Sequence, residues 1–258
     1  MTGAAGSGNA QSDHHLTQEE HAPKWRFVLL IVFCVFGIGV FTALGIWQVE
    51  RRAWKLALID RVENRVHASP VAPPGPAKWP SVTRADDEYR AVQVTGRFAN
   101  DRETLVEAST ALGMGFWVLT PLETRDGFTV LINRGFVPRD RRDTATREAG
   151  QIAGGMTVTG LLRMTEPRGA FLRTNDPAAD RWYSRDVDAI AKARGLVHVA
   201  PYFIDAGPAP NPGGLPVGGL TVVSFYNNHL VYAVTWFALG VMLAAALFRV
   251  VLGRWRQG

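Results

Sequence analysis

The sequence has a single cysteine, Cys34, among 258 residues. One thiol excludes an intramolecular disulfide, a Cys-x-x-Cys metal site and the Cys-x-x-Cys-His pattern of covalently attached haem. Copper carriers with paired thiols are excluded by the same count. The sequence also contains no Gly-x-Ser-x-Gly, no Walker phosphate loop and no His-Glu-x-x-His. We therefore do not expect an enzyme of these classes.

Charge is absent from two long stretches. Phe27 to Trp47 is 21 residues without Asp, Glu, Lys, Arg or His, and Leu230 to Phe248 is 19 such residues. At about 1.5 Å per residue, a helix of either length spans a hydrocarbon core of roughly 30 Å. Buried helices of soluble proteins seldom run this far without a charge. The sequence predicts transmembrane helices over 24–47 and 229–251.

The first span is longer than the usual apolar core of a cleaved signal peptide, so we interpret it as an uncleaved anchor. Residues 1–23 are rich in Gly, Ala and Ser and include three histidines. They have too little apolar surface to fold, and a disordered tail is expected there. Residues 252–258 form a second short tail.

The net charge of +5 and the pI near 9.7 are compatible with a protein that binds nucleic acid. The basic residues are scattered, and no nucleic-acid-binding motif accompanies them. Several of them flank the two spans, where basic residues anchor helices at lipid headgroups. The lipid bilayer, not nucleic acid, is the expected partner of this charge.

The charge bias around the second span gives the orientation. No Lys or Arg lies within about 20 residues before this span, and Arg249, Arg254 and Arg256 follow it. The positive-inside rule then predicts cytoplasmic termini and a central domain in the periplasm, with the protein in the cell inner membrane. Arg51 and Arg52, on the outer side of the first span, are exceptions to this rule that ask for a functional explanation.

The region between the spans, residues 48–228, is expected to fold as a β-rich domain. Helical periodicity continues through 48–66, and a Pro-rich stretch over 69–80 suggests a semi-rigid linker. From Tyr89 the apolar period changes to two, as in YRAVQVTGRF, FTVLINRGFV and MTVTGLLRM. A short helix over DVDAIAKAR ends at Gly195. The fold class is thus a membrane α part with a soluble α+β domain, in which two helices flank an antiparallel sheet or small open barrel.

The domain itself offers little chemistry. His67 and His198 are isolated, and isolated histidines are more often structural than catalytic. Arg134, in the step Asn133-Arg134-Gly135, is suited either to an anionic ligand or partner carboxylate, or to a structural ion pair in a turn. The sequence alone does not favour one of these two interpretations.

The membrane edges carry more interest. At 100° per residue, Trp47, Arg51 and Trp54 share one helical face. His229 opens the second apolar run at about the depth of Trp47 and Gln48, because both positions lie on the same side of the membrane. Its face continues with Ala233, Trp236 and Gly240, which we expect to leave room for a flat ligand beside an indole wall. An ionisable residue at this depth is a candidate functional site, and an interfacial histidine bonded to headgroups is the equal alternative.

Three segments resemble one known family. LGIWQVERRAWKLALI (44–59), GFWVLTPLETRDGFTVLINRGFVP (115–138) and NNHLVYAVTWFALG (227–240) are similar to the Surfeit locus protein 1 family, whose members are cytochrome c oxidase assembly factors. The resemblance covers the chain from Leu44 to Gly240 in the right order. Gly115 matches a family signature, and both tails and the Pro-rich stretch are unmatched.

The resemblance implies a two-span protein with its domain in the periplasm or intermembrane space. It implies assistance to the haem–copper subunit of the oxidase, and transient, non-covalent binding of haem a, for which haem a synthase is a source. His229 matches the family's candidate axial ligand of the iron. Arg51 and Arg52 would then meet the propionates, and Trp47 and Trp236 complete the expected site. The alternative is a membrane scaffold that binds the oxidase subunit or haem a synthase without haem. An envelope hydrolase is disfavoured, because no nucleophile–base pair is evident.

Overall fold

The computed structural model describes residues 24–167, 173–221, 223 and 227–256. The disordered tail expected over 1–23 lies outside these residues. The chain divides into two compact units: Met1–Trp54 with Asn227–Gly258 form the first, and Lys55–Tyr226 form the second. We describe each unit by itself.

Two long helices dominate the first unit. Helix α1 runs from Lys24 to His67 and helix α4 from His229 to Trp255, and both are long and apolar enough to cross a membrane. Large apolar side chains project outward; Phe33 and Phe36 are each 71% exposed. Such exposure in water would carry a large hydrophobic cost, whereas a hydrocarbon environment suits it. The protein is therefore a membrane protein with two spanning helices.

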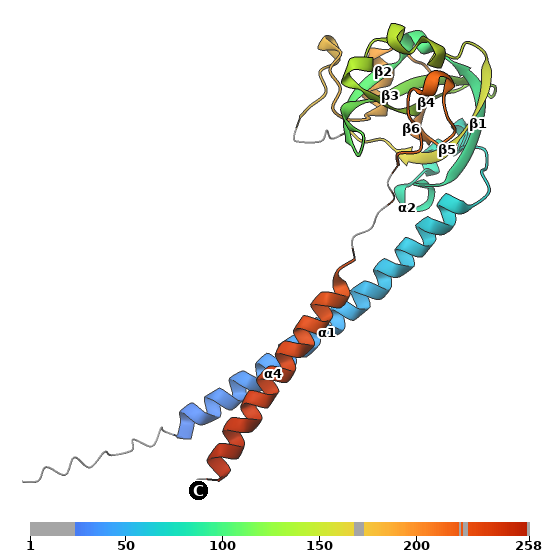
Figure 1. The fold of residues 1–258 in the computed structure, drawn as a ribbon. Coiled ribbons are helices and arrows are strands. Elements are labelled where there is room, and N and C mark those ends of the chain that lie inside the picture. The colour runs from blue at the N-terminus through green and yellow to red at the C-terminus, as the bar shows by residue number, and fades with distance from the viewer. Residues whose placement is uncertain (1–23, 168–172, 222, 224–226, 257–258) are drawn as a thin grey trace, which may run out of the picture. The chain divides into compact units, whose positions relative to one another are not determined.

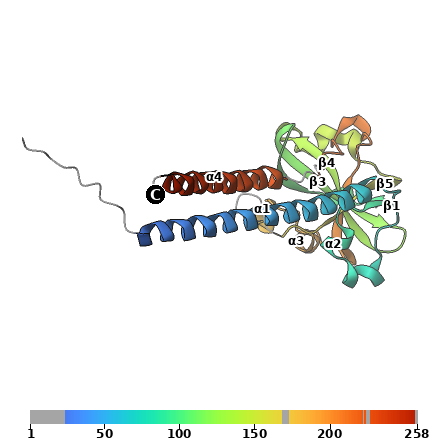
Figure 2. The same ribbon diagram turned by 90° about the horizontal axis from the view of Figure 1, so that it is seen from below.

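Within this unit, α4 lies beside α1 (Figures 1 and 2). The contact surface of α4 includes Ala233 and Gly240, both buried, and that of α1 includes Cys34, Gly45 and Gln48. The spacings of these positions are eleven and three residues on α1 and seven on α4, and each of them returns to the same side of a helix. We call this contact the helix seam.

Small residues allow the close approach of the two helices at the seam. A Cβ atom built on Gly45 would lie 2.5 Å from the ring of Phe237, and one built on Gly37 would lie 2.8 Å from Leu243. Phe41 and Trp236 stack across the seam with ring centroids 5.8 Å apart. Glycine on one helix facing a large side chain on the other is a common way to pack membrane helices without a hydrophobic driving force.

The second unit is built on a closed ring of strands. The sheet order is β1-β5-β6-β4-β3-β2, and an additional β1–β3 pairing closes five strands into a barrel, with β2 added outside β3. The β4–β6 pair is parallel and the other pairs are antiparallel. The α+β fold class and the small barrel are confirmed, whereas the sequence predicted an antiparallel sheet or an open barrel and the ring is closed. The strands are β1 Ala91–Phe98, β2 Thr104–Thr110, β3 Gly113–Thr124, β4 Thr129–Pro138, β5 Gly155–Met164 and β6 Val199–Ala206.

Short helices connect and cover the strands. Helix α3 has its N-terminus capped by the Asp186 carboxylate, which accepts from the backbone N–H of Ala189. Gly195 follows in a left-handed conformation at φ 60°, as expected for a helix that stops at glycine. The short helices are α2 Arg84–Asp87, α3 Val187–Ala193, and the 3-10 helices Pro76–Ser81, Asn100–Arg102, Arg139–Arg141, Thr144–Gly150, Pro177–Ala179 and Pro212–Gly214.

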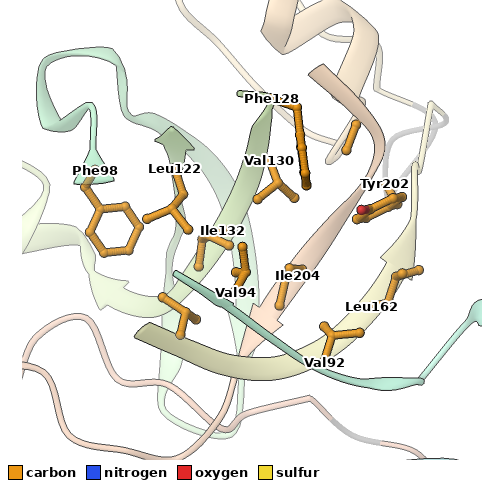
Figure 3. Packing of buried hydrophobic residues seen from close by; sticks show 12 residues of the cluster. Val92, Val94, Phe98, Leu122, Phe128, Val130, Ile132, Leu162, Tyr202 and Ile204 are labelled. Carbon is orange, nitrogen blue, oxygen red and sulfur yellow. The ribbon is translucent and has the colours of Figure 1, made fainter. Parts of the chain in front are cut away.

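Apolar side chains fill the barrel. Figure 3 shows side chains of β1, β3, β4, β5 and β6 pointing toward one another, among them Val94, Leu122 and Ile132. A second buried cluster, which includes Trp182, Ile190 and Phe203, packs on the outside of the ring. Strand β4 contributes to both clusters, and its buried residues follow one another without alternating with exposed ones, as in a strand buried on both faces.

The Pro-rich stretch, for which the sequence suggested a linker, packs against the barrel. Val71 forms a bridge with Val92 of β1. The carbonyl oxygen of Pro74 accepts hydrogen bonds from Tyr202 Oη at 2.6 Å and from Trp79 Nε1 at 3.0 Å. Proline rings supply apolar surface without backbone donors that need partners, so this stretch covers one side of the domain.

Candidate functional site at the helix seam

His229 is the first residue of α4, and its side chain is half-buried. Its Nδ1 atom lies 2.7 Å from Oε1 of Gln48 on α1. Gln48 is 8% exposed, although it is polar and lies at the end of an apolar helix segment. A buried amide needs a hydrogen-bond partner, and the imidazole supplies it. This pair joins two residues that are 181 positions apart in the chain.

Arg51 and Arg52 follow Gln48 by one helical turn on α1. The guanidinium carbon of Arg51 lies 4.1 Å from the centroid of the Trp54 ring, which is a cation–π contact. Arg51 is exposed and Arg52 is half-buried. The structure thus brings His229 to the turn of α1 that directly precedes Arg51 and Arg52.

The two tryptophans of the expected site differ in their surroundings. Trp47 is 53% exposed on α1, beside Gln48 in sequence. Trp236 is half-buried and stacks on Phe41. The room that Ala233 and Gly240 were expected to leave for a flat ligand is occupied by α1, because Ala233 is buried and Phe41 approaches Gly240. Any flat ligand at His229 therefore has to lie outside this stretch of the seam.

Arg134 belongs to the second unit and is buried in β4. Its Nη2 donates to the carbonyl oxygen of Gly150 and to Oδ1 of Asn211, and its guanidinium lies 4.7 Å from the ring centroid of Phe98. Burial lowers its pKa to about 10. Its hydrogen-bond acceptors among the described residues are a carbonyl and an amide, so Arg134 ties loops to the barrel and forms no ion pair with a described carboxylate, and its Nε and Nη1 atoms are buried without a described partner.

Asn133 points into a network of charged side chains on the barrel. Asp205 Oδ1 accepts from Asn133 Nδ2 at 2.7 Å and from Arg185 at 3.1 Å. Asp205 Oδ2 accepts from Arg163 at 2.8 Å and from Thr221 at 2.9 Å. Four donors satisfy this carboxylate, so no acceptor capacity is left for a ligand.

The charged form of Arg163, at the centre of this network, is stabilised by the neighbouring carboxylates. Burial disfavours the charged form of Arg163, but the neighbouring negative groups, Asp205 foremost, raise its pKa above the ordinary value. Glu166 and Glu88 complete its ion pairs. We interpret the network as structural.

Comparison with known proteins assigns the family. A profile of the SURF1 family matches residues 35–241. The chain belongs to this family. It is 36% identical to Surfeit locus protein 1 of Rattus norvegicus over 261 residues, covering 94% of this chain and 80% of the rat protein. The identity to the protein of the same name from Homo sapiens is also 36%, over 95% of this chain and 82% of the human protein. A SURF1-like protein of Monosiga brevicollis is 36% identical over 83% of this chain and 85% of its own length.

The residues of the candidate site all lie inside the part of the chain that matches the SURF1 family. Gln48 and His229 lie near the two ends of the matched range 35–241, so this range includes both sides of the helix seam. Most of the helix seam, though not Cys34 and Leu243, therefore lies within the part of the chain that the family match covers.

Sequence reasoning missed the contact between Gln48 and His229. The residue stands in the family segment 44–59, yet a glutamine one turn before two arginines resembles an ordinary interfacial residue. Its helical face, shared with Arg52, was visible in the sequence, whereas its partner was not. No group of three or more His, Cys, Asp or Glu side chains that could hold a metal ion occurs among the described residues. A haem iron needs only one imidazole from this chain, so the donor set fits an axial ligand better than a multidentate ion site.

Proposed function

We propose that this SURF1 family member is an assembly factor for cytochrome c oxidase that holds haem a at His229 and assists its insertion into the haem–copper subunit. One observation carries the proposal: a half-buried imidazole begins α4 and contacts α1 one turn before Arg51 and Arg52. An imidazole beside an apolar surface and two cations matches the iron, the macrocycle and the propionates of a haem.

Each residue has a definite task in this proposal. His229 coordinates the iron, and Arg51 and Arg52 pair with the propionates. Trp47 offers exposed indole surface to the macrocycle, whereas Trp236 supports the site through its stack on Phe41. Haem a carries the electron-transfer and oxygen chemistry, which belongs to the oxidase once the cofactor is delivered. The chain itself binds and orients, so we do not assign it an enzymatic reaction.

The proposed location follows from charge. Arg249, Arg254 and Arg256 at the C-terminal end of α4 favour the cytoplasm, so the barrel belongs in the periplasm and the helices in the cell inner membrane. There the haem a synthase would supply the cofactor and the haem–copper subunit would receive it. A reporter that is active only in the periplasm should be active when inserted near Pro74 and silent when fused after Gly258. The opposite pattern contradicts this orientation.

The close packing of the seam supports a second candidate. Because α1 covers Ala233 and Gly240, the two helices leave no gap there for a cofactor. A scaffold that binds the oxidase subunit or the haem a synthase through its outer faces, without haem, would need no such gap.

One experiment separates these two functions. The full chain, co-expressed with a haem a synthase and purified in detergent, should show the absorption of bound haem a. His229→Ala should lose most of it, while the matched control His67→Ala, at the exposed end of α1, should keep it. Purified protein without haem, or His229→Ala with the full haem content, would favour the scaffold.

The cellular role has its own test. Deletion of the gene should lower the activity and haem a content of the aa3-type oxidase and leave respiration through quinol oxidases intact. Expression of His229→Ala should restore less activity than the parent chain. Normal oxidase activity in the deletion strain would contradict an assembly role of either kind.

A further inference from the structure

Gln48 faces the imidazole that we assign to iron, and it does so from the other helix. We propose that Gln48 is a positioning residue: it holds the proton of His229 on Nδ1 and thereby presents Nε2, with its lone pair, to the metal. The inference rests on the haem function proposed above and adds a residue, a ring nitrogen and a protonation state to it.

Hydrogen-bond chemistry fixes the tautomer. The Oε1 atom of Gln48 has lone pairs and no proton, so it only accepts. A 2.7 Å contact between Oε1 and Nδ1 therefore requires that Nδ1 donates. A neutral imidazole has one N–H, so Nε2 is then unprotonated. Histidine ligands generally have their second nitrogen hydrogen-bonded in this way, which fixes both the tautomer and the orientation of the ring.

Burial keeps the pair together. Gln48 is 8% exposed, and its helical neighbours on the seam include Gly45 and Phe41. Water therefore competes poorly for the amide, and separation from His229 would leave a buried polar group without a partner. Both side chains stand on long helices and not on loops, so their relative position is set by helix packing.

The choice of an amide and not a carboxylate has a chemical consequence. A carboxylate that accepts from Nδ1 makes the imidazole a stronger electron donor and favours ferric iron, whereas an amide oxygen does so weakly. Glutamine at position 48 thus favours an imidazole ligand of moderate donor strength, and moderate strength suits a cofactor that must be released.

The experiment compares the parent chain, Gln48→Leu, Gln48→Glu and His229→Ala as full chains in one detergent. Thr42→Val is the matched control, since it removes a polar side chain from an exposed face of the same helix, where Thr42 bonds only to the Ile38 carbonyl. Three quantities are measured: haem affinity by titration, the reduction potential of the bound haem, and the histidine tautomer in the haem-free protein by ¹⁵N NMR.

We expect Gln48→Leu to weaken haem binding by about 10- to 100-fold, the range typical for loss of a partner behind a histidine ligand. In its haem-free NMR spectrum the His229 signals should shift from one tautomer to a mixture. Gln48→Glu should bind ferric haem at least as tightly as the parent and at a lower reduction potential. A purely structural role of Gln48 would change thermal stability and leave the potential and the tautomer unchanged.

The outcomes separate this inference from the proposed function. If His229→Ala binds haem like the parent, the haem site is elsewhere and the proposed function fails. If His229→Ala loses haem while both Gln48 variants keep the parent affinity, potential and tautomer, only the positioning role is overturned. If Gln48→Leu does not fold, the Gln48→Glu variant and the His229 tautomer of the parent chain still test the positioning role. A parent chain in which His229 carries its proton on Nε2 contradicts the inference.

Discussion

The barrel and the helix pair treat buried polar groups differently. In the barrel, Asp205 accepts four hydrogen bonds from four different side chains, and Arg163 is surrounded by carboxylates. In the helix pair, the described polar contact between the two helices is the Gln48–His229 bond, which uses one imidazole nitrogen and leaves the other available. The barrel unit also holds buried donors without a described partner, Nε and Nη1 of Arg134, so the difference concerns the Asp205 network and not every polar group of the barrel.

This difference tells us where to look for function. A saturated network contributes to the stability and uniqueness of the fold, because every member already has its partners. An ionisable residue in an apolar helix seam is a candidate functional position, and the half-buried imidazole nitrogen that does not face Gln48 is the atom available to a ligand. Substitutions in the barrel should thus reduce stability, whereas those around His229 should reduce haem binding first.

Removal of Asp205 is expected to give the largest effect. Asp205→Ala leaves Arg163, Arg185 and Asn133 without their shared acceptor, and the loss of one partner in a buried ion network costs about 3–5 kcal/mol. The free energy of unfolding of the full chain, followed by tryptophan fluorescence in denaturant, measures it. The control Asp101→Ala removes a carboxylate that is 80% exposed and should cost less than about 1 kcal/mol. Equal effects of the two variants would contradict the distinction between network and surface.

Gly115 tests the close packing of the barrel. A Cβ atom there would lie 2.1 Å from the carbonyl oxygen of Val137 on β4, so Gly115→Ala forces neighbouring strands apart. We expect a loss of about 1–3 kcal/mol, typical of overpacking. Gly155→Ala is the matched control in β5, since the nearest atom would be 3.9 Å away. The same unfolding measurement applies, and a destabilised Gly155→Ala with an unaffected Gly115→Ala would refute the packing argument.

The helix seam is tested by the same kind of change. Gly45→Ala places a methyl group 2.5 Å from the Phe237 ring, and we expect lower thermal stability of the helices by about 1 kcal/mol, since the ring is a side chain that can turn aside. Gly39→Ala meets no atom within 4 Å and should be neutral or stabilising by up to about 1 kcal/mol, because alanine favours helix. Circular dichroism on heating in detergent compares them. Identical melting of the two variants would argue against the seam.

Trp236 should give the smallest effect. Trp236→Ala removes the stack with Phe41, and an aromatic pair contributes about 0.5–1.5 kcal/mol beyond its buried area. Haem affinity in a titration should fall by roughly two- to tenfold, well below the loss in His229→Ala. Trp255→Ala, on the exposed end of α4, is the control and should not change affinity. A loss as large as that of His229→Ala would mean that Trp236 contacts the haem directly.

The sequence predicted the helices and strands better than it predicted how the strands close into a barrel. Two uncharged apolar runs predict α1 and α4 because length and hydropathy are local properties, and the period of two predicts β1, β4 and β5. The β1–β3 pairing that closes the barrel and the parallel β4–β6 pair join distant segments, and no local pattern encodes them. The proline-rich stretch illustrates the same limit, because its contact with Tyr202 depends on a strand more than a hundred residues away.

The site was predictable only in part. The family segments give His229 and the arginine turn by residue type and position. The partner of His229 was not evident, since Gln48 and His229 meet only when the two helices pack, and their separation of 181 positions carries no periodic signal. Arg134 shows the converse case: its residue type is typical of anion binding, yet burial in β4 turned it toward a carbonyl and an amide oxygen.

The distance along the chain between Gln48 and His229 also concerns the order of synthesis. Helix α1 leaves the ribosome early, and its glutamine has no partner until α4, the last helix, has been made and inserted. A nascent chain or one truncated before α4 therefore lacks the proposed iron ligand. Any premature stop before residue 229 removes the imidazole together with the second span. The proposed haem site thus exists only in a chain whose translation and membrane insertion are complete.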